Sequence, residues 1–427
     1  MSLELGDTTF KRRQVSDDVD SQEQEVNDAL LTKAKERCRA VAPIALEVLQ
    51  ALASEPAWKK NHDDSRLLLT LIPLTDPDLV TELALPDDTA ERVSSVVGKL
   101  FSSDTSKDDF IVNVILRKYL RTVFLTRKSV SSRLAAYPDP MAGRGEGIPG
   151  DDASAKPWKF TDVRAIPFLA WAVREADKTT VEKNWRLILP ALLTLVDDNS
   201  TPFRRRGLVI LETFLDKIPS ETLESGGLSQ VIESAITPTL NFLPSLTPAD
   251  ESVELLGPAF AALRRLASKT TGGDKTKLLD RCMREGVLHG FVHAREHPSI
   301  VALLCRQMGA IVAEMGFHAV KHLKDMVPLL VGILTDPFSP AAVLDPAIDA
   351  LQAVLRTCWP RMSDWGEEIL QAVIACWLNH GEDEVGVKEG LVRCVGMLHA
   401  TLGPDWSGVV KQEPQLAGLF SQIPRME

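Results

Sequence analysis

Proline recurs inside apolar helical segments of this chain at a regular distance, and this repeat limits the possible folds more than any other feature. The segments LILPALLTLV, AITPTLNFL and DMVPLLVGIL carry Pro190, Pro238 and Pro328, which are 48 and 90 residues apart. Because the second distance is twice a period of about 45 residues, one further unit is expected between Pro238 and Pro328. Residues 276–315 supply it, with an amphipathic helix on each side of a short turn. A two-helix unit of about 40–47 residues is typical of HEAT and armadillo arrays.

Each of these units continues with a turn and a second amphipathic helix. In residues 206–215 and 344–355 the apolar side chains recur at i, i+3, i+4 and i+7, which places them on one face of a helix. Strand-like alternation is nearly absent. A proline inside a helix removes one backbone hydrogen bond and bends the helix, so each first helix is expected to curve over its partner. The predicted fold class is therefore all-α, a HEAT/armadillo-like α-solenoid of stacked helix pairs.

The same patterns divide the chain into segments. Upstream of the array, helices are predicted over 27–53, 64–74, 87–102, 108–127 and 160–176. Residues 137–159 are rich in Gly, Pro and Asp and show no periodicity. The expected order is a disordered N-terminal tail (1–26), an N-terminal helical block (27–136), a linker or long loop (137–159), a HEAT-like repeat array (160–403) and a C-terminal tail (404–427).

Composition excludes several classes of protein. With 427 residues the chain exceeds the size at which a single core stops growing, about 250–300 residues. Its net charge of -11 argues against a broad surface for nucleic acid or anionic membrane, because such surfaces are basic. No segment approaches the roughly 20 apolar residues of a membrane span, and the first residues lack the apolar core of a signal peptide. We expect a soluble intracellular protein that binds neither nucleic acid nor membrane.

Acidic and basic residues face each other across the turn in ILPALLTLVDDNSTPFRRRG, residues 188–207. In HEAT units the first helix commonly ends in Asp, and an Arg of one unit bonds the Asp of the next, so that a ladder forms along the stack. The matching residues are Asp197, Asp198, Arg204 and the small Gly207. One guanidinium suffices for such a ladder, and the candidate partner-binding residues of this turn are therefore Arg205 and Arg206.

Tryptophan supplies two further candidates for partner binding. Most tryptophans of repeat helices belong to the core, but Trp is also a preferred anchor of protein interfaces. Trp365 and Trp406 lie near the C-terminal end of the array, where a solvent-facing indole would be available to a partner.

Metal chemistry is a remote alternative. His293, Glu296 and His297 match H-x-x-E-H, a pattern in which two histidines bind zinc and the glutamate acts as general base. Pro298 follows directly, so the helix is expected to end there and leave His297 in the turn. His318 and His322 are also spaced i, i+4, and for them too metal binding is only a remote alternative. The six cysteines form no C-x-x-C pair and are expected to be buried apolar residues, with no metal and no cofactor.

The amino-acid sequences of several segments are similar to those of a known family. LPALLTLVDD, RRRGLVILETFL and LNFLPSLTP resemble the Tti-two family of Tel-two-interacting proteins, subunits of the trimeric TTT co-chaperone complex. The resemblance is strongest across 185–268 and extends from about 158 to 403. It implies a non-enzymatic scaffold, with no catalytic residue carried over.

The resemblance also implies partners and location. A member of this family is expected to bind the Tti-one subunit and, together with Tel-two, to support chaperone-linked stabilisation of phosphatidylinositol-3-kinase-related kinases such as TOR, ATM and ATR, in the cytoplasm and the nucleus. Stacked helix pairs suit this role because they present long surfaces to extended partners. The alternatives are a karyopherin-like HEAT transport adaptor, which would bind a Ran-type GTPase, and the zinc hydrolase.

Overall fold

The computed structural model describes residues 21–54, 64–101, 107–124, 156–160, 162–380, 385–403, 416 and 418–420. Within these residues the regular structure is helical and contains no strand, so the predicted all-α fold class is confirmed. The chain divides into two compact units, the first made of Met1–Leu195 with Asp216–Pro219 and the second of Val196–Leu215 with Ser220–Glu427. This division does not coincide with the one expected at 137–159.

The first unit consists of short helices that follow one long helix. In chain order its helices are α2 (Ser21–Leu52), α3 (Asp64–Leu71), η2 (Ile72–Thr75), α4 (Pro77–Glu82), α5 (Thr89–Leu100), α6 (Lys107–Asp109), the π-helix η3 (Phe110–Leu120), α7 (Arg121–Phe124), α9 (Pro157–Phe160), α10 (Ala165–Glu175) and α11 (Lys178–Val196). Helix α2 begins at Ser21, earlier than the tail predicted for 1–26 allows, and contains the predicted Pro43. Cys38 and Ala42 of α2 pack against a buried cluster of the α4 region, which includes Leu79 and Leu83.

The segment predicted as a linker, 137–159, ends in ordered structure. Its last residues belong to α9, where Trp158 is buried and its ring stacks on Phe124 with 5.5 Å between ring centroids. An indole that can bury this much apolar surface stabilises even a one-turn helix. The remainder of the expected linker, 137–155, lies outside the described residues.

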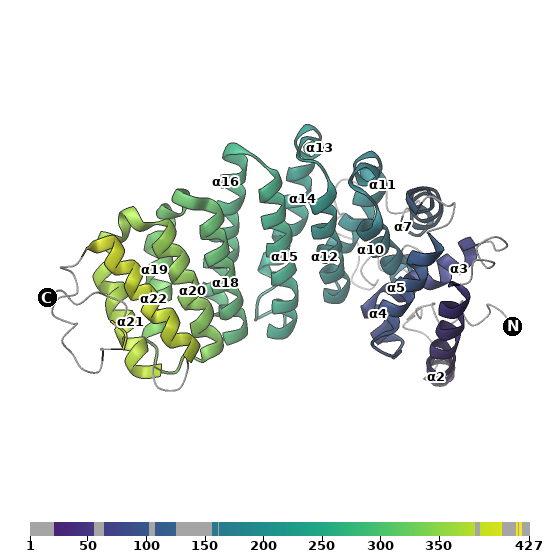
Figure 1. Cartoon of the computed structure of the whole chain (residues 1–427), viewed down its shortest axis with the longest axis horizontal. Helices are drawn as coiled ribbons and strands as arrows, with labels where there is room; N and C mark the ends of the chain where they lie inside the picture. The colour runs from purple at the N-terminus through teal and green to yellow at the C-terminus, as the bar shows by residue number, and fades with distance from the viewer. Residues whose placement is uncertain are drawn as a thin grey trace, which may run out of the picture. The chain divides into compact units, whose positions relative to one another are not determined.

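The second unit is a stack of helix pairs (Figure 1). It contains α12 (Thr201–Lys217, of which the last two residues belong to the first unit), α13 (Ser220–Ser225), α14 (Leu228–Ile236), η4 (Thr237–Asn241), α15 (Ala249–Lys269), α16 (Gly272–Arg281), the π-helix η5 (Cys282–Leu288), α17 (His289–Ala294), α18 (Pro298–Met315), η6 (Gly316–His322), α19 (Leu323–Thr335), α20 (Ala341–Thr357), η7 (Trp359–Asp364), α21 (Gly366–His380) and α22 (Val385–Leu402). The unit predicted at 276–315 is formed by α16, η5, α17 and α18.

The second helices of four successive pairs, α15, α18, α20 and α22, pack in series and run in the same direction. Arg264, late in α15, donates through Nε to Oε1 of Glu314, late in α18, over 2.8 Å. A Cβ on Gly309 of α18 would lie 3.2 Å from the Cα of Ala350, so α18 and α20 touch at the backbone. The side-chain amide of Gln352 in α20 donates to the carbonyl oxygen of Gly390 in α22 over 3.3 Å. These matched positions show a HEAT-like solenoid built by stacking parallel second helices.

The predicted prolines fall into two kinds of position. Pro190 and Pro328 lie inside α11 and α19, as expected. Pro238 does not lie inside an α-helix: α14 ends at Ile236, and the proline stands in the first turn of the 3₁₀ segment η4. A first-turn position removes the need for the amide hydrogen that proline lacks.

One apolar stretch, Pro298–Thr335, is long enough to span a membrane, and its most apolar window of 18 residues has a mean hydropathy of 1.5, although the sequence suggested no span. It is not one helix. Gly316, with a φ of 57°, ends α18 in a conformation that side chains other than glycine rarely adopt, and η6 separates α18 from α19. Fifty-six per cent of its most apolar window is buried inside the protein, which is the burial of core helices.

Two smaller sequence predictions concern buried residues. The cysteines at 282, 305, 358, 376 and 394 are buried and Cys38 is half-buried, and all six are free thiols; burial raises the pKa of Cys305 to about 12. In the segment expected to be a C-terminal tail, 404–427, the described residues Leu416, Leu419 and Phe420 are buried. Apolar residues of the tail therefore pack on the protein.

Candidate partner-binding surfaces

The turn between α11 and α12 is built around two buried polar side chains. The side chain of Asp198 accepts a hydrogen bond from the amide of Ser200 at 2.9 Å, which closes the turn directly before α12. Arg204 is 7% exposed, and its Nε donates to the carbonyl oxygen of Asp198 over 2.9 Å. Burial lowers the pKa of Arg204, and the charges of Asp197 and Asp198 oppose that shift. The buried guanidinium therefore holds the turn closed and is not available to a partner.

Arg204 also reaches the next helix pair, but not through an aspartate. Its Nη1 donates to Oγ1 of the buried Thr239 over 3.4 Å, and its guanidinium lies 4.4 Å from the ring centroid of Phe242. The segment that follows, LNFLPSLTP, contains no carboxylate, so the expected rung from Arg204 to an aspartate of the next unit is replaced by a hydroxyl and an aromatic face. Gly207, the last residue of the expected ladder, is buried in α12.

Arg205 and Arg206 are only half-buried. Nε of Arg205 is 4.0 Å from Oε2 of Glu254 in α15. Beside it, Oγ1 of Thr201 donates to Oε2 of Glu251 over 2.6 Å. The start of α12 is thus tied to the start of α15 by polar contacts. Exposed ion pairs of this kind contribute about 0–1 kcal/mol to stability, and both side chains keep a solvent-exposed part.

Of the two tryptophans singled out from the sequence, the one that the structure describes is not the most exposed. Trp365 is half-buried behind η7, and Trp406 lies outside the described residues. Trp359, six residues before Trp365, is 60% exposed at the start of η7. No local pattern in the sequence distinguishes these two positions, because the irregular turn of η7 decides which indole faces solvent.

The H-x-x-E-H residues do not assemble into a ligand set. His293 is in α17, which ends at Ala294, while Glu296 lies in the turn and His297 precedes the first residue of α18 with an extended backbone. The two histidines therefore share no helical face, as expected from Pro298. Over the described part of the chain, no group of three or more His, Cys, Asp or Glu side chains is placed to hold a metal ion.

His318 and His322 also point to different surroundings. His322 is buried, with Nε2 2.9 Å from Oδ1 of Asp280 in α16. The same carboxylate pairs with Lys321 at 2.6 Å and with Arg284 at 3.1 Å. Asp280 borders an open groove of about 480 Å³, lined by Gly272, Gly273, Thr276, Lys277, Asp280, His318 and Lys321. Its carboxylate is already shared among three cationic or imidazole side chains, so the cluster links α16 to η6.

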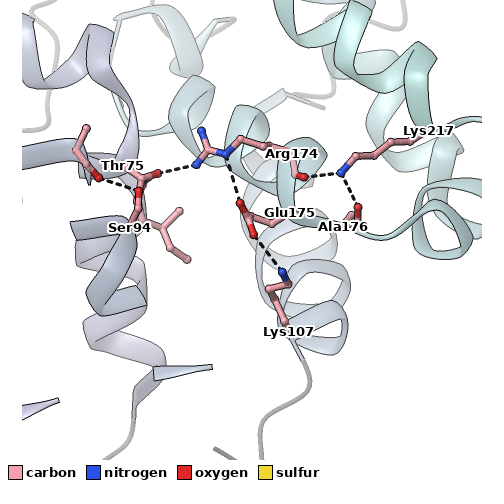
Figure 2. A network of polar contacts seen from close by, with 9 residues as sticks. Thr75, Ser94, Lys107, Arg174, Glu175, Ala176 and Lys217 are labelled. Atoms are coloured by element: carbon pink, nitrogen blue, oxygen red, sulfur yellow. Dashed lines mark hydrogen bonds and ion pairs between the residues drawn. The ribbon is translucent and has the colours of Figure 1, made fainter. Parts of the chain in front are cut away.

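A second polar network lies in the first unit (Figure 2). Arg174 donates through Nη2 to Oγ1 of Thr75 over 3.3 Å, and Lys107 lies 3.0 Å from Oε2 of Glu175. Nζ of Lys217 donates to the carbonyl oxygen of Arg174. Burial alone would raise the pKa of Glu175, but the hydrogen bond and charge of Lys107 lower it. Each of the three cations is therefore bonded within the unit, and the network joins η2, α6, α10 and Asp216–Pro219.

Exposed apolar side chains remain as candidates for partner contact. On α2, Val41, Ile44 and Val48 lie at i, i+3 and i+7 and are all exposed, so this helix has an exposed apolar stripe beside the face that packs on the α4 region. In the second unit most of the exposed large apolar residues lie near the ends of helices or in turns, and Val209 is exposed in the middle of α12. Contiguous exposed apolar surface marks interaction sites in soluble proteins.

These features define a helical-repeat protein of the scaffold type. Its helix pairs are stacked, its polar side chains serve structural contacts, and apolar side chains remain exposed at its surface. The sequence model of the Tti2 family matches residues 67–341, more than half of the chain, and the chain belongs to the Tti2 family. With this membership comes, in general terms, the role of a subunit of the TTT complex.

Among solved structures, the chain is similar to the crystal structure of importin beta in a polyethylene glycol condition, with a TM-score of 0.45 and 13% sequence identity. The match covers 85% of this chain and 41% of that one, so the chain spans less than half the length of importin beta.

Proposed function

We propose that this chain is the adaptor subunit that binds the Tti-one subunit of the TTT complex and, with the Tel-two subunit, supports chaperone-linked stabilisation and assembly of phosphatidylinositol-3-kinase-related kinases of the TOR, ATM and ATR class. The match to the Tti2 family carries this proposal. The stack of helix pairs supports it, because such stacks offer extended surfaces to large partners. The exposed apolar residues of both units support it further.

The test of the complex is affinity purification of the tagged full chain from native cells. We expect two larger helical-repeat subunits to be recovered in equimolar amounts, and the assembly to survive gel filtration. Recovery of the chain without these subunits would overturn the proposal. Recovery of a Ran-type GTPase, released by a change of its nucleotide, would favour the karyopherin-like adaptor, and stoichiometric zinc lost on His293→Ala would favour the hydrolase.

The test of the kinase role is depletion of the chain in cells. We expect the protein levels of TOR, ATM and ATR to fall while their messenger RNA levels stay constant, and re-expression of the full chain to restore them. Constant kinase levels after complete depletion would contradict the role. The proposal includes a cytoplasmic and nuclear location, to be checked by imaging the tagged chain.

A further inference from the structure

Four large apolar side chains of the second unit are exposed at the spacing of the helix pairs. Leu246 is 91% exposed, Val292 73%, Phe338 90% and Leu378 55%. Successive members are 46, 46 and 40 residues apart, which is the period of the repeat. Each lies just before a second helix, in the turn that precedes it or in the last turns of the helix before that turn. We call these four residues the apolar turn row.

The four residues lie along one edge of the unit. The second helices α15, α18, α20 and α22 run parallel, so their amino-terminal ends, and the turns that precede them, lie on the same side. A direct contact joins two of these turns: His380, two residues after Leu378, has Nε2 3.4 Å from the carbonyl oxygen of Asp336, two residues before Phe338. In Figure 1 these helices lie side by side.

The opposite edge differs. In the described connections of that edge the exposed large apolar residues are Phe317, 64% exposed, and Trp359, in two successive connections. Val209 and Val231, 43% and 49% exposed, lie within α12 and α14. A row with one exposed apolar residue in each of four successive pairs distinguishes the edge of the apolar turn row. Isolated exposed leucines are ordinary in soluble proteins. Exposed apolar residues that recur at the same place in each helix pair instead indicate a shared role for these positions.

Charge on this edge is mostly negative between the apolar residues. Exposed carboxylates stand at Asp250, Glu254, Glu296, Asp336 and Asp345. The described cationic side chains among them are Arg295 and Lys388, and Lys388 lies over the ring of Trp377 at 5.8 Å. Carboxylates at helix amino termini are stabilised by the positive end of the helix dipole. Together these carboxylates also attract a basic ligand to this edge.

The sign of the charge reverses at one end of the edge. Arg205 and Arg206 lie in the first turns of α12, which is tied to the start of α15 through the contacts of Thr201 and Arg205 with Glu251 and Glu254. At the α12 end of the edge, Arg205 and Arg206 outnumber the exposed carboxylate of Asp197. From α15 onward the charge is mostly negative, and the apolar turn row lies along this negative part. A ligand whose charges complement this edge can therefore bind in one orientation only.

We propose, on the basis of the proposed function, that the apolar turn row binds one amphipathic helix of the partner subunit, apolar on the contacting face, basic on both flanks and acidic at the end that meets Arg205 and Arg206. Neighbouring packed helices are about 8–10 Å apart, and seven residues of an α-helix rise about 10.5 Å. A helix of about three heptads, with an apolar residue at each heptad step, therefore spans the row.

The experiment uses the full chain co-expressed with the Tti-one-type subunit, and measures the affinity of the purified proteins. We expect the double variant Leu246→Glu/Phe338→Glu to weaken binding by about tenfold or more, as substitution of buried interface anchors does. The matched control is Phe317→Glu, which places the same charge at an exposed phenylalanine on the opposite edge and should change the affinity less than about twofold. Circular dichroism of each variant should equal that of the parent protein.

Photo-crosslinking from position 338 identifies the ligand. We expect the crosslinked peptide to come from a partner helix with lysine or arginine on its flanks, and the double variant Glu296→Arg/Asp345→Arg to weaken binding and reduce its dependence on salt. Binding of the Leu246→Glu/Phe338→Glu variant equal to that of the parent would overturn the row while leaving the proposed function intact.

Other outcomes separate the remaining occupants. Failure of the parent protein to bind the subunit would overturn the proposed function itself. A crosslink from position 338 to this same chain in a monomer, or a homodimer that Phe338→Glu dissociates, would show that the row is covered by the chain itself or by a second copy, and would overturn the partner helix.

Discussion

Nε2 of His322 lies 2.9 Å from Oδ1 of Asp280, and this pair joins η6 to α16 across 42 residues of sequence. Burial, the largest influence, lowers the pKa of His322, and the charge of Asp280 opposes the shift. Burial alone would raise the pKa of Asp280, but Lys321 and His322 lower it. Burial thus favours the neutral form of the imidazole, and the neighbouring side chains favour the charged form of the carboxylate.

This pair predicts a loss of stability at mildly acidic pH. A histidine whose folded pKa lies below its unfolded value of about 6.5 binds fewer protons when folded, so stability falls as the pH drops below about 6.5, by at most about 1.4 kcal/mol per pH unit. The lowered pKa of Asp280 acts only near pH 4 and below. His322→Gln should reduce the dependence of the melting temperature on pH between pH 7 and 5.5. The control His318→Gln, at an exposed site, should keep the parent profile; equal profiles for all three proteins would contradict the prediction.

Removal of the buried guanidinium should destabilise the second unit. Arg204→Met keeps the apolar stem of the side chain but leaves the Asp198 carbonyl oxygen and the Thr239 hydroxyl without this donor, which we expect to cost about 2–3 kcal/mol of unfolding free energy. Arg206→Met, at a half-buried site of the same helix, should cost less than about 0.5 kcal/mol. Urea denaturation followed by circular dichroism compares the two, and equal losses would show that Arg204 has no special structural role.

Charge reversal at the neighbouring arginines should affect binding more than folding. In Arg205→Glu/Arg206→Glu, the new carboxylate at position 205 lies beside Glu254. We expect this repulsion to lower the free energy of unfolding by about 0.5–1 kcal/mol at this exposure. We expect weaker pull-down of the partner subunit with unchanged helicity. Pull-down at the parent level would remove Arg205 and Arg206 from the interface.

Two helical glycines should respond to alanine with opposite sign. At Gly309 a Cβ would meet the Cα of Ala350 at 3.2 Å, so Gly309→Ala must push α18 and α20 apart and should destabilise the protein by about 1–2 kcal/mol. At Gly332, inside α19, a Cβ would meet nothing within 4 Å. Gly332→Ala should therefore stabilise by about 0.5–1 kcal/mol through its helix propensity. Thermal melting of both variants gives the sign, and shifts in the same direction would contradict the close packing at Gly309.

The helix pairs could be predicted from the sequence because their periodicity is local. The stripes at 206–215 and 344–355 lie inside α12 and α20, and the unit expected at 276–315 is present. Pro238 was misplaced because a proline in the first turn of a 3₁₀ segment and a proline inside an α-helix leave similar apolar patterns. The difference lies in backbone conformation, which composition does not report.

The surface could be predicted less well. Arg204, Arg205 and Arg206 are adjacent in sequence, yet one is buried and two are not, because the helical rotation of 100° per residue turns only Arg204 toward Phe242. Leu246 and Phe338 stand in turns, where apolar periodicity has no meaning, so their exposure follows only from the placement of the neighbouring helices.

The serial packing of α15, α18, α20 and α22 has a consequence for biosynthesis. Each of these helices docks on the one made shortly before it. The surface on which a new pair packs has therefore already emerged from the ribosome, and loop closure is short. The unit can grow by accretion, pair by pair, and the last pair, α21 and α22, can detach and reattach while the earlier pairs keep their own neighbours.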